Sequence, residues 1–163
     1  MSSLLIGQVV FFASVGLILY VYFGYPLLMF VLARLTSSTV ARAEIEPTVS
    51  FIITAFNEER DIRKKLENTF ALGYPSDKLE IIVASDASTD GTETIVREFA
   101  GRGVKLVRQT QRRGKTAAQN LAVEHAAGEI LVFSDSTFKY ERNAVRELTA
   151  NFADRSVGCV AGK

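Results

Sequence analysis

The stretch VSFIITAFN at residues 49–57 decides the fold that this sequence predicts. Its first part, 49–53, is short and rich in β-branched and aromatic residues, which is typical of a buried strand. Apolar side chains then recur at Ile62, Leu66 and Phe70, which is the spacing of one face of a helix. The sequence therefore predicts a strand that is followed by a helix.

The same alternation continues along the chain. Further strands are expected at 79–83, 104–107 and 130–133, and a fifth is expected to start at 157–161. Further helices are expected around 95–99, at 115–127 with Gly128 as a C-terminal cap, and around 145–152. Such alternation predicts an α/β fold with a Rossmann-like, mostly parallel sheet that helices cover on both faces. Ligands of these sheets bind beyond the carboxyl ends of the strands, so the residues there are the candidates for function.

The N-terminal region carries a long apolar segment. No charged residue lies between Leu4 and Ala33, and a helix needs about 20 apolar residues to cross a bilayer. A signal peptide is the competing interpretation, but the segment is too long for one and no basic residue precedes it. We expect a transmembrane anchor at 1–35, a linker at 36–47 and a soluble domain at 48–163.

The charges after the apolar segment predict an orientation. Arg34 and Arg42 are the first basic residues of the chain, and the positive-inside rule favours the cytoplasmic side for them. The soluble domain is therefore expected in the cytoplasm, held at the cell (inner) membrane.

Composition excludes several classes of function. The formal net charge is +1, which gives no overall field for binding nucleic acid. Cys159 is the only cysteine, so neither a disulfide within the chain nor a multi-cysteine zinc site can form. Cys159 lies in an apolar run and is expected to be a buried structural thiol. His125, the only histidine, is expected to be a packing or surface residue.

Polar residues follow the first two strands. Asn57 after the first strand is suited to cap the next helix, whereas Phe56 offers a flat ring for a nucleotide base. Asp90 and Glu93 after the second strand have the spacing of a capping box, which predicts a structural role for Asp90. Asp86 stands directly at the strand end and is free to accept a hydrogen bond from a base or a ribose.

Charged residues also follow the third and fourth strands. The segment 108–115 carries four basic residues and ends at Lys115, where a helix start adds its own positive end. A solvated loop explains the segment equally well. Asp135 ends an apolar strand and needs a partner such as a divalent cation, although a turn aspartate bonded to backbone amides is the alternative.

In order and spacing, these four strand ends resemble family 2 glycosyltransferases over 49–163. The resemblance is carried by FIITAFNEE at 51–59, IVASDASTDGT at 82–92, GKTAAQN at 114–120 and FSDST at 133–137. The segment YVYFGYP at 20–26 looks like the first membrane helix of bacterial exopolysaccharide synthases of this family, the poly-N-acetylglucosamine, cellulose and hyaluronan synthases. The fold implied is the GT-A fold, here incomplete.

The resemblance implies a UDP-sugar donor, Mg²⁺ or Mn²⁺, and a glycan or lipid-linked acceptor. Phe56 would lie against the uracil, Thr54 would contact it through the backbone and Asp86 would accept from it. Lys115 would lie near the base or diphosphate, and Asp135 would contact the ribose or the metal-bound diphosphate. The donor-binding residues implied are Thr54, Ala55, Phe56, Asn57, Glu58, Asp86, Lys115 and Asp135, with Asp135 also the metal ligand.

Three positions depart from the family pattern. Ala87 replaces a usual glycine and Ser85 a usual aspartate. Thr137 stands at the second aspartate of the Asp-X-Asp motif, and a hydroxyl is a weaker metal ligand than a carboxylate.

The resemblance also implies an inverting sugar transfer, in which a carboxylate base beyond the fifth strand activates the acceptor. The chain stops at Lys163, before that base, so we expect it to carry only the donor-binding half and to be inactive alone. Two alternatives stay open. The chain could be another nucleotide-using α/β enzyme such as a nucleotidylyltransferase, or a non-catalytic docking module at the membrane.

Overall fold

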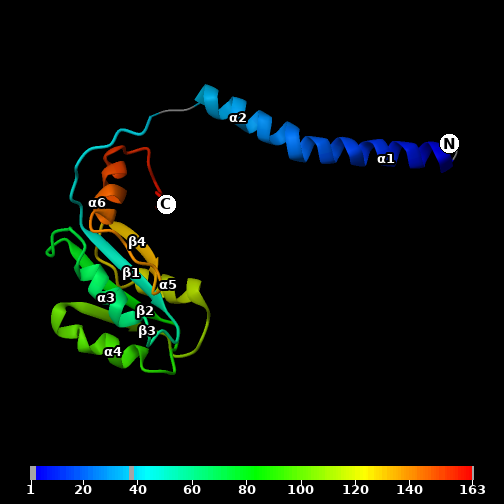
Figure 1. Cartoon of the computed structure of the whole chain (residues 1–163). Coiled ribbons are helices and arrows are strands. Elements are labelled where there is room, and N and C mark those ends of the chain that lie inside the picture. The colour runs from blue at the N-terminus through cyan, green and yellow to red at the C-terminus, as the bar shows by residue number, and fades with distance from the viewer. Residues whose placement is uncertain (1–2, 37–38, 163) are drawn as a thin grey trace. The chain divides into compact units, whose positions relative to one another are not determined.

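The computed structural model describes residues 3–36 and 39–162. They fall into two compact units that divide between Thr39 and Val40. Each unit has its own architecture, as the ribbon in Figure 1 shows.

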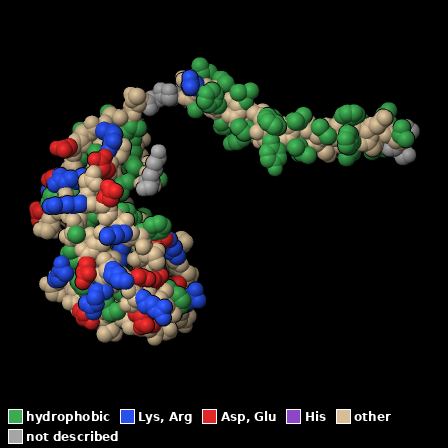
Figure 2. Space-filling view, viewed as in Figure 1, with side chains coloured by type: hydrophobic (Ala, Val, Ile, Leu, Met, Phe, Trp, Pro, Cys, Tyr) green, Lys and Arg blue, Asp and Glu red, His purple; other side chains and the backbone are tan. Residues whose placement is uncertain are grey.

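The N-terminal unit is one continuous helical stretch. Helix α1 (Ser3–Leu19) passes through a π-helical turn, η1 (Tyr20–Gly24), into α2 (Tyr25–Thr36). Within the part of the chain that the structure describes, this is the one stretch long and apolar enough to cross a membrane, by length and composition alone: Leu4–Leu35 contains an 18-residue window with a mean hydropathy of 2.3. Figure 2 shows apolar side chains along its whole length.

The second unit is built on a parallel four-stranded sheet. The strands are β1 (Val49–Ala55), β2 (Leu79–Ser85), β3 (Val104–Arg108) and β4 (Ile130–Asp135), in the order β3-β2-β1-β4. Every pairing is parallel. The predicted α/β fold with a Rossmann-like parallel sheet is confirmed.

Helices cover both faces of this sheet. Helices α3 (Ile62–Phe70), α4 (Thr92–Glu98) and α6 (Ala144–Thr149) contribute to one apolar core, with the one-turn helices η2 (Ala100–Arg102) and η3 (Ala150–Ala153) beside α4 and α6. Helix α5 (Lys115–Val123) packs on the opposite face, over Ile52 and Ile82. β1 lies inside the sheet, and all seven of its residues are buried. The central strand is therefore a fixed base for the loop that follows it.

Helix α5 ends earlier than the sequence predicted. It was expected to reach Ala127, but it stops at Val123. The chain then turns so that the backbone N–H of Ala127 donates to Glu80 and that of Gly128 to Ser50. A Cβ on Gly128 would lie 2.4 Å from the backbone nitrogen of Ser50. Gly128 is thus needed for a close approach to β1, and the expectation that it caps the helix was wrong.

The expected fifth strand does not form. Residues 157–161 form no regular secondary structure and pair with no strand among the described residues, which leaves β4 at the edge of the sheet. Phe133 of β4 is exposed. Cys159 is exposed as well, so the prediction of a buried thiol was wrong because the strand that would have buried it is absent.

The segment before β1 contacts the globular unit. Ala43 donates its backbone N–H to Ala150, Arg42 pairs with Glu147, and Arg146 pairs with Glu46. Residues that the sequence assigned to a linker at 36–47 are therefore attached to the region of α6 from position 41 onwards.

Candidate functional site

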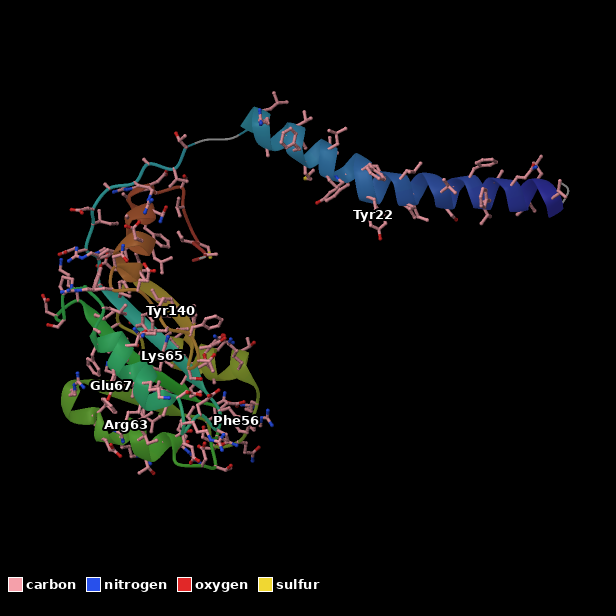
Figure 3. The ribbon with its side chains drawn as sticks, viewed as in Figure 1. Tyr22, Phe56, Arg63, Lys65, Glu67 and Tyr140 are labelled. Atoms are coloured by element: carbon pink, nitrogen blue, oxygen red, sulfur yellow. The ribbon has the colours of Figure 1, made fainter. Side chains whose placement is uncertain are left out.

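A cleft of about 310 Å³ opens at the carboxyl ends of β1, β2 and β4. Figure 3 labels Phe56 at this end of the sheet. The cleft is lined by Thr54, Ala55, Phe56, Glu58, Asp86, Arg112, Gly114, Lys115, Asp135, Ser136 and Thr137. The structure thus brings together in one place the donor-binding residues that the resemblance implied, with the exception of Asn57.

The loops after β1 and β2 are tied to each other. The side-chain oxygen of Asn57 accepts from the backbone N–H of Thr89 at 2.9 Å, and the Thr92 hydroxyl accepts from the backbone N–H of Glu58 at 2.8 Å. Glu59 accepts from the N–H of Gly91 at 2.9 Å. Asn57 therefore does not cap α3, as one interpretation of the sequence had it, but holds the neighbouring loop.

Asp90 is part of the same junction. It accepts from the backbone N–H and the hydroxyl of Thr92 and from the backbone N–H of Glu59. Burial raises the pKa of Asp90, but these hydrogen bonds outweigh it and leave the pKa below its ordinary value. Asp90 therefore has the structural role that the sequence predicted.

Glu93 does not complete the predicted capping box. Its buried carboxylate accepts from the Ser85 hydroxyl at 2.8 Å and from Arg108 at 2.7 Å. Both partners stand at strand ends, Ser85 on β2 and Arg108 on β3. Glu93 therefore fixes the strand end that carries Asp86, because a charge-assisted bond at this depth outweighs a solvent-facing cap.

Asp86 is buried, with 4% of its surface exposed. One carboxylate oxygen accepts from the backbone N–H groups of Arg113 (2.9 Å) and Gly114 (3.1 Å), and the other accepts from Gly114 at 3.0 Å. A carboxylate has about four lone-pair sites, so Asp86 retains capacity for one more donor. It shapes the loop that leads into α5 and still faces the cleft.

Gly114 permits this turn because its φ of +92° is open to glycine and strained for other residues.

Phe56 is half-buried and presents its ring to the cleft. The guanidinium of Arg112 lies over that ring, 4.0 Å from its centroid, and 3.9 Å from the carboxylate of Asp86. Arg112 therefore occupies the ring face on which a base could stack. The sequence analysis placed Arg112 in a basic segment but did not assign it to the site. Its position three residues before Lys115 was the sequence feature that could have indicated this role.

Asp135 ends β4 opposite Thr54 of β1 and forms an ion pair with Lys115 at the start of α5. Thr54 lines the cleft, but its hydroxyl oxygen is buried and has no hydrogen-bond partner among the described residues. An unpaired buried hydroxyl is costly.

The residues around Asp135 fit only one kind of metal site. The described part of the chain holds no group of three or more His, Cys, Asp and Glu side chains placed to bind an ion. Thr137 lines the cleft beside Asp135 and supplies a hydroxyl. Hard cations such as Mg²⁺ are often held by one or two carboxylates together with substrate phosphates. The site fits a cation bound jointly with a diphosphate, and does not fit one held by the protein alone.

Comparison with known proteins gives a consistent result. The family described as Glycosyl transferase family 2 matches residues 50–163. The probable glycosyltransferase YdaM of Bacillus subtilis is 37% identical over 123 residues, which cover 72% of this chain and 29% of YdaM.

Two solved structures are similar. The mannosyltransferase PcManGT of Pyrobaculum calidifontis, in complex with GDP-Man and Mn²⁺, gives a TM-score of 0.76 at 37% identity over 88% of this chain and 45% of that one. TarS 1–349 of S. aureus, in complex with UDP-GlcNAc, gives 0.58 at 27% identity over 66% and 31%. The chain spans roughly a third to a half of the length of these proteins.

Proposed function

The protein belongs to glycosyl transferase family 2, and on that premise we propose that its globular unit binds the nucleoside diphosphate part of a sugar donor in the cleft beyond β1, β2 and β4. The observation that carries this is the gathering of Phe56, Asp86, Lys115 and Asp135 around one cleft. Family membership favours a glycosyltransferase over a nucleotidylyltransferase or a docking module.

The proposed donor is a UDP-sugar. Phe56 stacks on the base, and Asp86 uses its remaining lone pair to accept from a ring N–H. A base on Phe56 must take the place that Arg112 now holds, which moves the guanidinium toward the diphosphate or over the other face of the base. Thr54, which lines the cleft, contributes contacts to the base through its backbone.

Lys115 and Asp135 are proposed to bind the diphosphate. Asp135 would hold Mg²⁺ or Mn²⁺ together with the phosphates, and Lys115 would release Asp135 and pair with a phosphate oxygen. When bound, such a cation neutralises charge on the diphosphate. Lys115 adds to this because it stands at the positive end of α5.

The proposed reaction is transfer of the sugar with inversion at the anomeric carbon. An acceptor hydroxyl attacks that carbon, and the bond to the nucleoside diphosphate breaks. The residues of this cleft bind and orient the donor and stabilise the charge of the leaving group, which is commonly the largest electrostatic contribution to such reactions. A general base is not assigned to any residue of the chain.

The proposed setting is the cytoplasmic face of the cell membrane. The apolar stretch Leu4–Leu35 supports an anchor, and Arg34 and Arg42 after it support the cytoplasmic orientation. A polysaccharide or a lipid-linked glycan is the proposed product, as in the exopolysaccharide synthases that the N-terminal segment resembles.

A GDP-linked sugar is the second candidate donor. The similar mannosyltransferase was solved with GDP-Man, at higher identity than the protein solved with UDP-GlcNAc. One carboxylate that accepts from a ring N–H serves uracil and guanine alike, so Asp86 does not decide between them.

Calorimetry on the full chain in detergent tests the donor site. We expect UDP or GDP to bind with Mn²⁺ present, and Asp86→Ala to bind at least tenfold more weakly, because a hydrogen bond to a charged group contributes about 1.5–3 kcal/mol. Asp77→Ala, outside the cleft, is the control. Equal nucleotide affinity for wild type and Asp86→Ala, or no nucleotide binding at all, contradicts the proposal.

A further inference from the structure

Lys65 is a buried cation in the middle of α3. It is only 2% exposed, although it follows two exposed basic positions on the same helix. It lies on the apolar stripe of α3 with Ile62, Leu66 and Thr69, which are buried too. Placing an ammonium group there costs free energy unless the protein supplies partners for it.

The partners of Lys65 come from the segment that follows β4. Its Nζ donates to the backbone carbonyl of Phe138 at 2.7 Å and lies 4.2 Å from the centroid of the Tyr140 ring. The Phe51 ring of β1 is 5.5 Å away and packs edge-on against Tyr140. Figure 3 shows Lys65 and Tyr140 together above the sheet.

Electrostatics link Lys65 to the cleft. Burial lowers the pKa of Lys65 to about 8, and the charge of Asp135 opposes that fall. Among the described residues, no carboxylate lies within ion-pair distance of Lys65. Asp135, which lines the cleft, is the acidic group whose charge raises the pKa of Lys65.

Asn68, one turn further along α3, holds the same segment. Its side chain donates to the carbonyl of Tyr140 at 2.9 Å and accepts from the N–H of Tyr140 at 2.8 Å. With the bond from Lys65, three hydrogen bonds join one turn of α3 to 138–140. That segment directly follows Asp135, Ser136 and Thr137, and its other side is exposed at Phe138 and Lys139.

Stability alone does not explain an ammonium group here. Replacing a buried charge by an apolar side chain of similar volume is often neutral or stabilising. Methionine has about the length of lysine without its charge and would fill the same space beside Phe51 and Tyr140. The chain nevertheless places a cation behind the position where we propose that an anionic diphosphate binds.

We propose, on the basis of the donor site proposed above, that Lys65 is a positioning residue for the nucleoside diphosphate. It fixes the backbone after Asp135, so that Asp135, Ser136 and Thr137 meet the ligand in one arrangement. It also adds a buried positive charge that acts on Asp135, the residue proposed to meet the phosphates. Lys65 acts through this segment and does not touch the ligand.

Lys65→Met, measured in the full chain in detergent, tests this role. We expect UDP with Mn²⁺ to bind about tenfold more weakly, the effect of one lost charge-assisted hydrogen bond, while the free energy of unfolding is unchanged or higher. Lys64→Met makes the same change at the adjacent exposed position and should bind like wild type.

The ratio of UDP dissociation constants without and with Mn²⁺ separates positioning from general stability. We expect Lys65→Met to reduce this ratio, because the phosphate and cation end of the site is affected. Val96→Ala removes buried methyl groups from α4, away from 138–140, and should lower stability while keeping the ratio. If Lys65→Met does not fold, Asn68→Ala is measured in its place.

Three outcomes are distinguishable. The role of Lys65 is supported if wild type binds the nucleotide, Lys65→Met (or Asn68→Ala in its place) reduces the ratio, and Val96→Ala leaves the ratio unchanged. Wild-type binding with the ratio intact in the tested variant overturns that role and leaves the donor site standing. No nucleotide binding by wild type removes the donor site and the role of Lys65 together.

Discussion

The two sides of the cleft are held in different ways. On one side, the loops after β1 and β2 bond directly to each other through Asn57, Glu58 and Glu59. On the other side, residues 136–140 after β4 make no such bond to a neighbouring loop among the described residues, and Lys65 and Asn68 of α3 hold them. The first side is fixed by bonds between its own loops, and the second by its bonds to α3.

The difference follows from the order of the strands. β1 and β2 are adjacent, so their loops emerge side by side and can share hydrogen bonds. β4 is an edge strand with β1 as its single partner among the described residues, so its loop is bordered by another loop on one side only. The side formed by the two bonded loops suits recognition of a flat nucleobase, whereas the side after β4 can adjust to phosphates and a sugar.

Removing Phe56, on the side formed by the loops after β1 and β2, should have the largest effect on nucleotide binding. Phe56→Ala should weaken UDP binding by about 2 kcal/mol, because stacking on an aromatic ring contributes about 1–3 kcal/mol per base. Phe133→Ala, at an exposed ring outside the cleft, is the matched control. Equal calorimetric affinities for the two variants would show that the base does not stack on Phe56.

Raising the pH probes the side of the cleft that Lys65 of α3 holds. The pKa of Lys65 is about 8 in the folded protein and 10.5 without burial, so the folded state binds fewer protons between these values. The free energy of unfolding of wild type relative to Lys65→Met should therefore be constant below about pH 8 and rise above it, by at most about 1.4 kcal/mol per pH unit.

Urea titrations from pH 7 to 10 measure this difference. Asp135 and the Tyr140 ring, which lies 4.2 Å from Lys65 Nζ, are kept in Lys65→Met, so the comparison isolates the change at position 65. A difference that stays level up to pH 10 would mean that the ammonium group keeps an ordinary pKa.

Asn68→Ala should loosen the same side without touching the lysine. It removes two hydrogen bonds to Tyr140, and a net loss of about 1 kcal/mol is expected. Hydrogen exchange of the Tyr140 amide should become about fivefold faster. Asn151→Ala, which loses bonds only to carbonyls of its own helical region, should leave that amide unchanged.

The smallest effect is expected at Ala87, in the loop after β2, and it concerns the free energy of unfolding. Ala87 has a φ of +57°, a left-handed conformation that costs about 1–2 kcal/mol for a residue with a Cβ. Ala87→Gly relieves this strain. The extra conformational freedom of glycine in the unfolded chain offsets about 0.4–1 kcal/mol of the stabilisation. The net gain in the free energy of unfolding should be about 0.5 kcal/mol.

Asn57→Gly is the counterpart for that measurement. Asn57 has a similar φ of +54°, but its side chain bonds Thr89, so glycine should destabilise the protein there. If both substitutions stabilise the protein, the hydrogen bonds between the two loops contribute little.

The sheet and the place of the cleft could be predicted from the sequence, because both depend on local patterns. Each strand is a short apolar run, and a parallel sheet brings the residues after its strands to one edge. The end of α5 and the fate of 157–161 could not be predicted, because each depends on partners distant in the sequence. Ser50 and Glu80 bind residues 127–128 just after α5, and the apolar run at 157–161 pairs with no strand among the described residues.

Lys65 was missed for a different reason. The helix was recognised from Ile62, Leu66 and Phe70, and a lysine between them reads as a surface residue. The signal was nevertheless present, since Lys65 falls at the third position after Ile62, on the same stripe as Leu66 and Thr69. A charged residue on an apolar stripe indicates either a buried partner or a function. Here it has the carbonyl of Phe138 as a partner.

The two margins of the sheet are protected unequally against self-association. The outer strand β3 displays Lys105 and Arg108, and charges on an edge discourage a second chain from adding a strand. β4 displays Phe133 instead, beside backbone groups that no described strand satisfies. At high concentration the protein is therefore expected to self-associate first through the β4 edge, and Phe133→Lys is the substitution expected to prevent this.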